Sequence, residues 1–166
     1  RNILFIPISP EKLDEGIDNL FNYLKKSDHP ILIKTALMHL EFEALHPFQD
    51  GNGRVGRMLI TLLLWSSGII SAPHFYISGY LEENKNLYID TMREVSSKNN
   101  WEDWCVFFLN AVEKQAIARA HRMGNKNKVH AIKFVSAGTI EERILDLLHY
   151  KEDLFEEVVE GAVEYK

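Results

Sequence analysis

One short stretch, HPFQDGNGRVGR at residues 46–57, holds most of the side chains that could do chemistry in this chain. It has an imidazole at His46, a carboxylate at Asp50 and guanidinium groups at Arg54 and Arg57, on either side of a Gly-Asn-Gly turn. The two arginines stand three residues apart at the start of an expected helix, where the helix dipole disfavours cations and like charges repel. A negatively charged partner should therefore compensate them.

The turn at Gly51, Asn52 and Gly53 indicates what that partner is. A turn without bulky side chains can point several backbone N–H groups inward, and together with the N-terminus of the next helix they form a cradle for an anion such as phosphate. Arg54 and Arg57 can then bind phosphate oxygens in a bidentate manner.

Asp50 and His46 supply the remaining groups. A carboxylate directly before the cradle suits Mg²⁺, which keeps water ligands and bridges phosphate oxygens. A histidine at the end of one helix can accept a proton from an incoming hydroxyl near neutral pH. Base, metal carboxylate, cradle and cationic clamp are the parts of an in-line attack at phosphorus. Singly, each feature is more often a turn or a solvated helix end, so the prediction rests on their combination.

Helices must position this stretch. Ser9 and Asn100 are expected N-caps, Gly68 should follow a helix end, and Pro47 should end a helix near His46. The third expected helix is apolar nearly all round and is predicted to be the core helix. Apolar spacing and these end signals predict a mainly α fold, with helices at residues 9–26, 31–45, 54–68, 82–98 and 100–118.

Composition narrows the functional classes. The chain has 166 residues, 46% of them hydrophobic, which suits one domain with a real core. Its net charge of −5 gives no global preference for nucleic acid or anionic membranes. The longest apolar run, residues 58–65, is too short to cross a bilayer. Cys105 stands alone in an apolar stretch, where a buried thiol in a reducing compartment is favoured, so a cytoplasmic location is expected.

The stretch 46–57 resembles, position for position, the Fic-domain family signature HxFx(D/E)GNGRxxR. The similarity extends over FIPISP, LMHLEFEALHPF, MLITLLLWSSGI and WEDWCVFFLNAVEKQA, so it covers about residues 1–115. The resemblance implies a Fic-type helical bundle around a helix-loop-helix active site and a Mg²⁺-dependent reaction. In that reaction AMP passes from ATP to a Tyr, Thr or Ser hydroxyl of a target protein, and pyrophosphate is released.

The resemblance also implies a role for each matching residue. His46 would be the general base and Asp50 the Mg²⁺ ligand. Tyr88, in a later helix, matches a family position near the nucleotide base, although helical tyrosines are more often core residues. The residues implied to bind the nucleotide are Gly51, Asn52, Gly53, Arg54, Arg57 and Tyr88.

Two family features are incomplete or missing. A flap hairpin often aligns the target segment by strand addition, and only its trailing edge, RNILFIP, matches here. The regulatory pattern (S/T)xxxE(G/N) does not occur in the sequence. Either the chain is unrestrained, or the restraint lies upstream or on a regulatory, antitoxin-like partner. The missing initiator methionine indicates a chain cut from something longer.

The C-terminal part resembles a different family, the last stretch of a Swi/Snf-type helicase-like ATPase. The similarity covers about residues 115–161, where a pattern QxxxRxxRxG precedes a strand expected at 129–135 and a helix expected at 139–161. The sequence has no GxxxxGK(S/T) phosphate loop, so this part cannot be an ATPase alone.

The predicted domains are therefore an N-terminally truncated Fic-type catalytic core at 1–115 and a strand-plus-helix appendage at 116–166. The change of resemblance indicates a fusion, a recombination scar or an assembly artefact. The alternative is a C-terminal extension that converged on the second pattern.

Other functions stay open. The same cradle suits transfer of another phosphate-containing group or removal of AMP, and the chain could be a non-catalytic remnant that binds a nucleotide or a partner. The basic run at 119–133 is more simply a solvated face than a nucleic-acid site. A zinc site is disfavoured because no HExxH motif is present, and His39 is expected to pack between helices. Phe48 is expected to be a core residue that anchors the loop.

Overall fold

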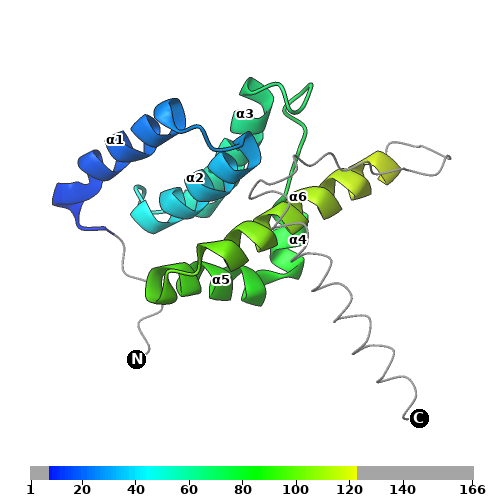
Figure 1. The fold of residues 1–166 in the computed structure, drawn as a ribbon. Helices are drawn as coiled ribbons and strands as arrows, with labels where there is room; N and C mark the ends of the chain where they lie inside the picture. Colours follow the sequence, from blue (N-terminus) through cyan, green and yellow to red (C-terminus); the bar gives the residue numbers. More distant parts are fainter. Residues whose placement is uncertain (1–7, 123–166) are drawn as a thin grey trace, which may run out of the picture.

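The structure, a computed structural model, describes residues 8–122 (Figure 1). The elements described are all α-helices: α1 (Pro10–Lys26), α2 (Ile31–Leu45), α3 (Asn52–Ser66), α4 (Ser78–Glu83), α5 (Lys85–Lys98) and α6 (Trp101–Arg122). The predicted mainly α fold class is confirmed for these residues. The flap remnant at 1–7, the strand expected at 129–135 and the helix expected at 139–161 lie outside the described residues.

The ends of α2 and α3 that face the site follow the sequence signals closely. α2 ends at Leu45 because His46, which precedes a proline, adopts a left-handed conformation with φ 49°. α3 begins at Asn52, earlier than the predicted residue 54, because Gly51 at φ 85° serves as its N-cap. Gly68, at φ 78°, follows the end of α3 as predicted.

The helix predicted at 82–98 is instead divided into α4 and α5 at Asn84. The Asn84 side chain donates a hydrogen bond to the carbonyl of Tyr80 at 2.9 Å, which offers the backbone an alternative to a continuous helix. Of the two predicted caps, Asn100 accepts from the N–H of Asp103 at 3.4 Å. Ser9 occupies the N-cap position of α1, but its side chain makes no capping hydrogen bond.

α2 is the central helix of the fold. It packs against α1, α3 and α6, while α4 and α5 pack against α6 (Figure 1). The prediction that α3 is the core helix is wrong, because Met58, Leu62 and Trp65 are 55%, 40% and 47% exposed. An apolar run cannot show by itself which face of a helix is covered by neighbouring helices. The buried residues of α2 are Ile33, Thr35, Ala36, Met38, His39, Leu40, Phe42 and Leu45.

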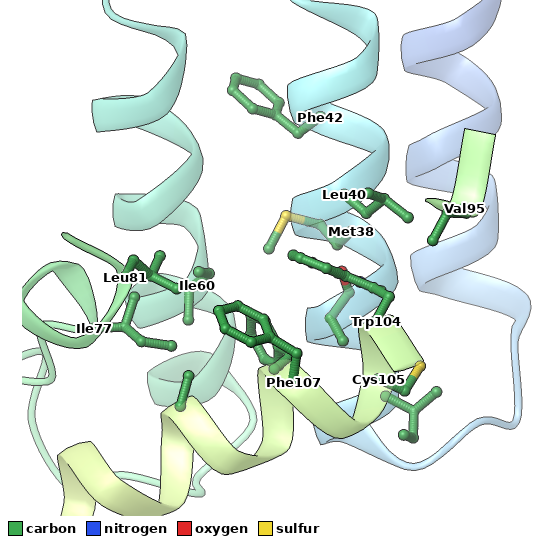
Figure 2. Packing of buried hydrophobic residues seen from close by; sticks show 14 of the residues in the cluster. Met38, Leu40, Phe42, Ile60, Ile77, Leu81, Val95, Trp104, Cys105 and Phe107 are labelled. Carbon is green, nitrogen blue, oxygen red and sulfur yellow. The ribbon is translucent and has the colours of Figure 1, made fainter. Parts of the chain in front are cut away.

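Aromatic side chains of α6 close the core. Figure 2 shows Trp104 and Phe107 projecting from α6 among the buried side chains of its neighbours. The Trp104 indole is fully buried and donates a hydrogen bond to the carbonyl of Ala36 at 3.0 Å, which ties α6 to α2. Cys105 is also buried, and burial raises the pKa of its thiol to about 11, as expected for a packing residue rather than a nucleophile.

Within residues 8–122, no helix combines the length and the apolar character that a membrane crossing requires.

Candidate active site

The loop at residues 46–51 joins α2 to α3 and is held by the side chain of Asn52. The Asn52 carboxamide oxygen accepts from the N–H of Phe48 at 2.8 Å, and its nitrogen donates to the carbonyl of Phe48 at 2.6 Å. Asn52 is only 2% exposed, so these hydrogen bonds are shielded from water. The shape of the loop is therefore set by a buried side chain at the start of α3. The sequence predicted a role for Asn52 in the anion cradle only.

The prediction that Phe48 is a core residue is wrong. Its side chain is 50% exposed, and its ring centroid lies 6.4 Å from that of Phe42 at the edge of the core. Because Asn52 makes hydrogen bonds with both the N–H and the carbonyl of Phe48, the conformation of the loop does not depend on burial of the ring.

Asp50 presents its carboxylate at the surface. One oxygen accepts from the N–H of Gly51 at 2.6 Å, and the other accepts from Arg54 Nη2 at 3.1 Å. The side chains of Arg54 and Asp50 are 75% and 92% exposed, so solvent screens this ion pair strongly. The carboxylate is thus accessible to a cation from solution.

The two guanidinium groups lie against the two glycines of the turn. A Cβ atom placed on Gly51 would be 3.4 Å from Arg54 Nη2, and one placed on Gly53 would be 3.0 Å from Arg57 Nη1. The first N–H groups of a helix have no intrahelical acceptor, and in α3 the N–H of Val55 is the first to bond back, to the carbonyl of Gly51 at 3.0 Å. The start of α3 therefore brings both guanidinium groups close to backbone N–H groups that have no intrahelical acceptor.

Glu43, one turn before His46 on α2, belongs to the same region and was missed by sequence analysis. Its carboxyl group faces the first turns of α3, since a Cβ atom placed on Gly56 would lie 2.5 Å from Glu43 Oε1. Burial raises the pKa of Glu43, whereas the charges of Arg57 and His46 act to lower it. The available signal was a carboxylate in the apolar stretch ILIKTALMHLEFEAL, three residues before the histidine.

His39 and Tyr88 form the inner end of this polar region. The Tyr88 hydroxyl and His39 Nε2 share a hydrogen bond of 3.0 Å. His39 is fully buried, which confirms its predicted packing role, and burial lowers its pKa to about 4. The ring of Tyr88 packs against Trp104 and Phe107, with centroids 6.0 and 6.1 Å away. Tyr88 thus lies in the core behind the loop, not on the surface with Asp50 and Arg54.

The described side chains offer few ligands for a metal ion. Among residues 8–122, no group of three or more His, Cys, Asp or Glu side chains could hold one. A Mg²⁺ ion needs only one or two carboxylates when phosphates and water complete its shell, so the single exposed carboxylate of Asp50 fits that ion.

A cavity of about 410 Å³ lies away from the loop and contains none of the residues 46–57. Its lining comes from the segment before α4, from α4 and from α6: His74, Tyr76, Gly79, Tyr80, Glu83, Lys114, Gln115, Ala118 and Arg119.

Comparison with known proteins identifies the class to which this fold and loop belong. The Fic/DOC family matches residues 1–64, so this part of the chain is a Fic/DOC domain segment that includes the whole stretch 46–57. The crystal structure of a Fic family protein from Desulfovibrio desulfuricans G20 has a TM-score of 0.62 and 22% sequence identity. That match covers 72% of this chain and 38% of the other, and at this identity it shows the fold alone.

Among curated proteins, a probable protein adenylyltransferase of Aquifex aeolicus (strain VF5) is 32% identical over 91 residues. The match covers 54% of this chain and 26% of that relative, so the chain spans about a quarter of its length. A putative SWI/SNF-related matrix-associated actin-dependent regulator of chromatin subfamily A member 3-like 1 from Arabidopsis thaliana is 45% identical over 47 residues. This second match covers 28% of this chain and 5% of that protein. The division into domains at residue 115 stays a prediction.

Proposed function

We propose that this chain is the catalytic part of a protein adenylyltransferase, which transfers AMP from ATP to a hydroxyl side chain of a target protein. One observation carries the proposal: the start of α3 gathers an amide cradle and the guanidinium groups of Arg54 and Arg57, with Asp50 before it and His46 at the end of α2. The protein adenylyltransferases among the relatives support it.

In the proposed reaction, the hydroxyl oxygen of the target attacks the α-phosphorus of ATP. A new O–P bond forms, the bond from that phosphorus to the bridging oxygen breaks, and pyrophosphate leaves. His46 accepts the hydroxyl proton, because its place at the end of α2 lies next to the cradle. The N–H groups at the start of α3 and the two arginines bind the phosphates and stabilise the charge that develops on them.

Asp50 is the residue that would hold Mg²⁺, since its carboxylate is exposed and directly precedes the cradle. The ion, when bound, would neutralise phosphate charge. A contact between Tyr88 and the nucleotide base, a regulatory or antitoxin-like partner and a cytoplasmic location stay predictions. The hydroxyl of Tyr88 is engaged with His39, so any contact with a nucleotide would involve the ring.

Labelled ATP tests this function. The protein is incubated with Mg²⁺, a cell lysate and ATP labelled at either the α- or the γ-phosphate. Compared with lysate alone, the added protein should increase the label on protein only from the α-labelled nucleotide. The His46→Ala variant should lose about 10²- to 10⁴-fold of the rate, the contribution typical of a general base. His74→Ala, which removes an exposed imidazole, is the matched control and should keep the full rate.

Two results would contradict the proposal. Equal labelling by the His46→Ala variant would exclude the proposed base. An increase in label from γ-labelled ATP that depends on the added protein would indicate transfer of a different group. Binding of ATP without any transfer would instead indicate a nucleotide-binding remnant.

A further inference from the structure

Glu43 has a buried oxygen that the proposed reaction does not use. Glu43 Oε1 is shielded from solvent and has no hydrogen-bond partner within the part of the chain that the structure describes. A buried polar atom of this kind carries a desolvation cost that nothing nearby repays through hydrogen bonding. If the buried Glu43 carboxylate is stabilised, the stabilisation must therefore come from neighbouring charges.

Arg57 is the cation of the proposed site that lies beside the same glycine as Glu43. Glu43 Oε1 and Arg57 Nη1 lie 3.8 and 3.0 Å from the position that a Cβ atom on Gly53 would occupy, so both groups flank the same point. The charge of Arg57 is also the larger of the two cationic influences that lower the pKa of Glu43, ahead of His46. The carboxyl group and the guanidinium group thus both lie next to Gly53 in the first turn of α3.

The other polar groups around Glu43 come from three helices. His46 lies one turn further along α2, His39 one turn back, and the Tyr88 hydroxyl approaches from α5. His39 is neutral near pH 7, because burial lowers its pKa to about 4, and burial together with the Glu43 charge raises the pKa of Tyr88. Neither group carries a positive charge near pH 7, so the positive charge that acts on Glu43 from α3 is that of Arg57.

We propose that Glu43 is a positioning residue for Arg57: its negative charge beneath the first turn of α3 holds the guanidinium group over the Gly53 end of the phosphate cradle. This inference rests on the proposed function, since it needs Arg57 to bind phosphate. An arginine held in place loses less side-chain freedom when an anion binds, which increases affinity. Gly53 and Gly56 allow the arrangement, because a side chain at either position would enter the space between α2 and α3.

A purely structural role for Glu43 makes a different prediction. If the carboxylate only supported the helix pair, Glu43→Gln would lower both stability and nucleotide affinity. A positioning role separates the two, because the amide has nearly the same shape without a charge to desolvate. The Glu43→Gln variant should therefore be at least as stable as the original protein and yet bind triphosphate more weakly.

The test is a double-mutant cycle read by calorimetric titration with Mg²⁺ and a non-hydrolysable ATP analogue. The proteins are the original chain, Glu43→Gln, Arg57→Met and the double variant. Glu43→Gln should weaken binding about 3- to 100-fold, the range expected for coupled neighbours, and should have no further effect once Arg57 is replaced. Glu41→Gln, the same change at an exposed position of α2, is the matched control and should bind normally.

The outcomes separate this inference from the proposed function. Unchanged binding by Glu43→Gln, or an equal loss with and without Arg57, overturns the inference alone. Absence of binding by the original chain overturns both. If Glu43→Gln does not fold, the stabilities of Arg57→Met and Arg54→Met decide the question. Arg57→Met should be the less stable because it leaves the Glu43 carboxylate without a cation, and equal stabilities overturn the inference.

Discussion

The helices α2 and α3 have the same length, 15 residues, and flank the same loop, but they differ in how much of their surface is buried. α2 is buried along its length between α1, α3 and α6. α3 leaves Met58, Leu62 and Trp65 open to solvent and presents its N-terminal turn to the loop. α2 therefore sets the position of the site, whereas the start of α3 supplies the groups that would contact a phosphate.

The polar contacts follow the same division. On the α2 side, His39 and Glu43 are shielded by neighbouring helices, and both have shifted pKa values. On the loop side, Asp50 and Arg54 form an exposed pair. Substitution of His39 should therefore change stability, and substitutions in the exposed Asp50–Arg54 pair should change binding of the nucleotide with little effect on stability.

The largest effect on stability is expected from His39. Burial lowers its pKa from 6.5 to about 4, so the unfolded chain takes up a proton that the folded chain rejects. The stability that neutral His39 contributes is present above pH 6.5 and is lost as the pH falls toward 4, a difference of about 3 kcal/mol when the shift is fully expressed. Denaturant unfolding of the original protein and of His39→Gln between pH 7 and 4 measures this change in the free energy of unfolding.

The His39→Gln variant should not lose this stability on acidification. The His74→Gln variant, changed at an exposed position, should lose it as the original protein does. Glu43 acts in the opposite sense: its raised pKa adds stability as the pH falls through the folded value, so the difference between variants isolates His39. Parallel curves for the original protein and His39→Gln would contradict the assignment.

Gly56→Ala tests how closely α2 and α3 approach. The added methyl group would lie 2.5 Å from Glu43 Oε1 and 3.2 Å from the ring of His39, and the ring has no room to move. Overpacking of this kind should cost about 2 kcal/mol in the free energy of unfolding. Gly79→Ala in α4 is the control, because nothing lies within 4 Å of its added methyl group. That variant should be neutral or slightly more stable, and equal stabilities of the two variants would contradict the close approach.

Asn52→Ala tests the buried link between α3 and the loop. Removal of the carboxamide leaves the N–H and carbonyl of Phe48 without these partners and should lower stability by about 1–2 kcal/mol. The loop should also bind the ATP analogue less tightly, because the cradle follows directly from Gly51. Asn86→Ala, at an exposed position of α5, provides the comparison and should change neither quantity.

The smallest effect on stability is expected from Arg54→Ala. The exposed pair with Asp50 is worth at most about 1 kcal/mol, so thermal unfolding should hardly change. Stabilisation of the protein by ATP and Mg²⁺ should nevertheless be reduced or lost in this variant. A large loss of stability without a change in this ligand effect would reverse the proposed division between the two helices.

Much of the fold could be predicted from the sequence, because the end signals of α2 and α6 act in the structure and α1 begins next to the expected cap, Ser9. Pro47 ended α2 at His46, and Asn100 marked the start of α6. The break at Asn84 was not predictable from periodicity, since a helix-compatible pattern runs through it. Nor could an apolar run show that α3 lies at the edge of the fold, because coverage depends on neighbours far away in sequence.

The candidate site residues were predicted from the motif, but the contacts of Asn52 and Glu43 behind the loop were not. Asn52 reads as part of a turn, and only the structure shows its side chain folded back onto Phe48. Glu43 reads as one of two glutamates in an apolar helix. Its distinction from Glu41 depends on which helix face meets α3, and that is a property of packing.

A crystal structure with Mg²⁺ and a non-hydrolysable ATP analogue tests the central claim most directly. We predict phosphate oxygens on the N–H groups at the start of α3, within hydrogen-bonding distance of Arg54 and Arg57, with the α-phosphorus facing His46. An analogue bound in the cavity lined by His74 and Arg119, or phosphates remote from both loop arginines, would contradict the account.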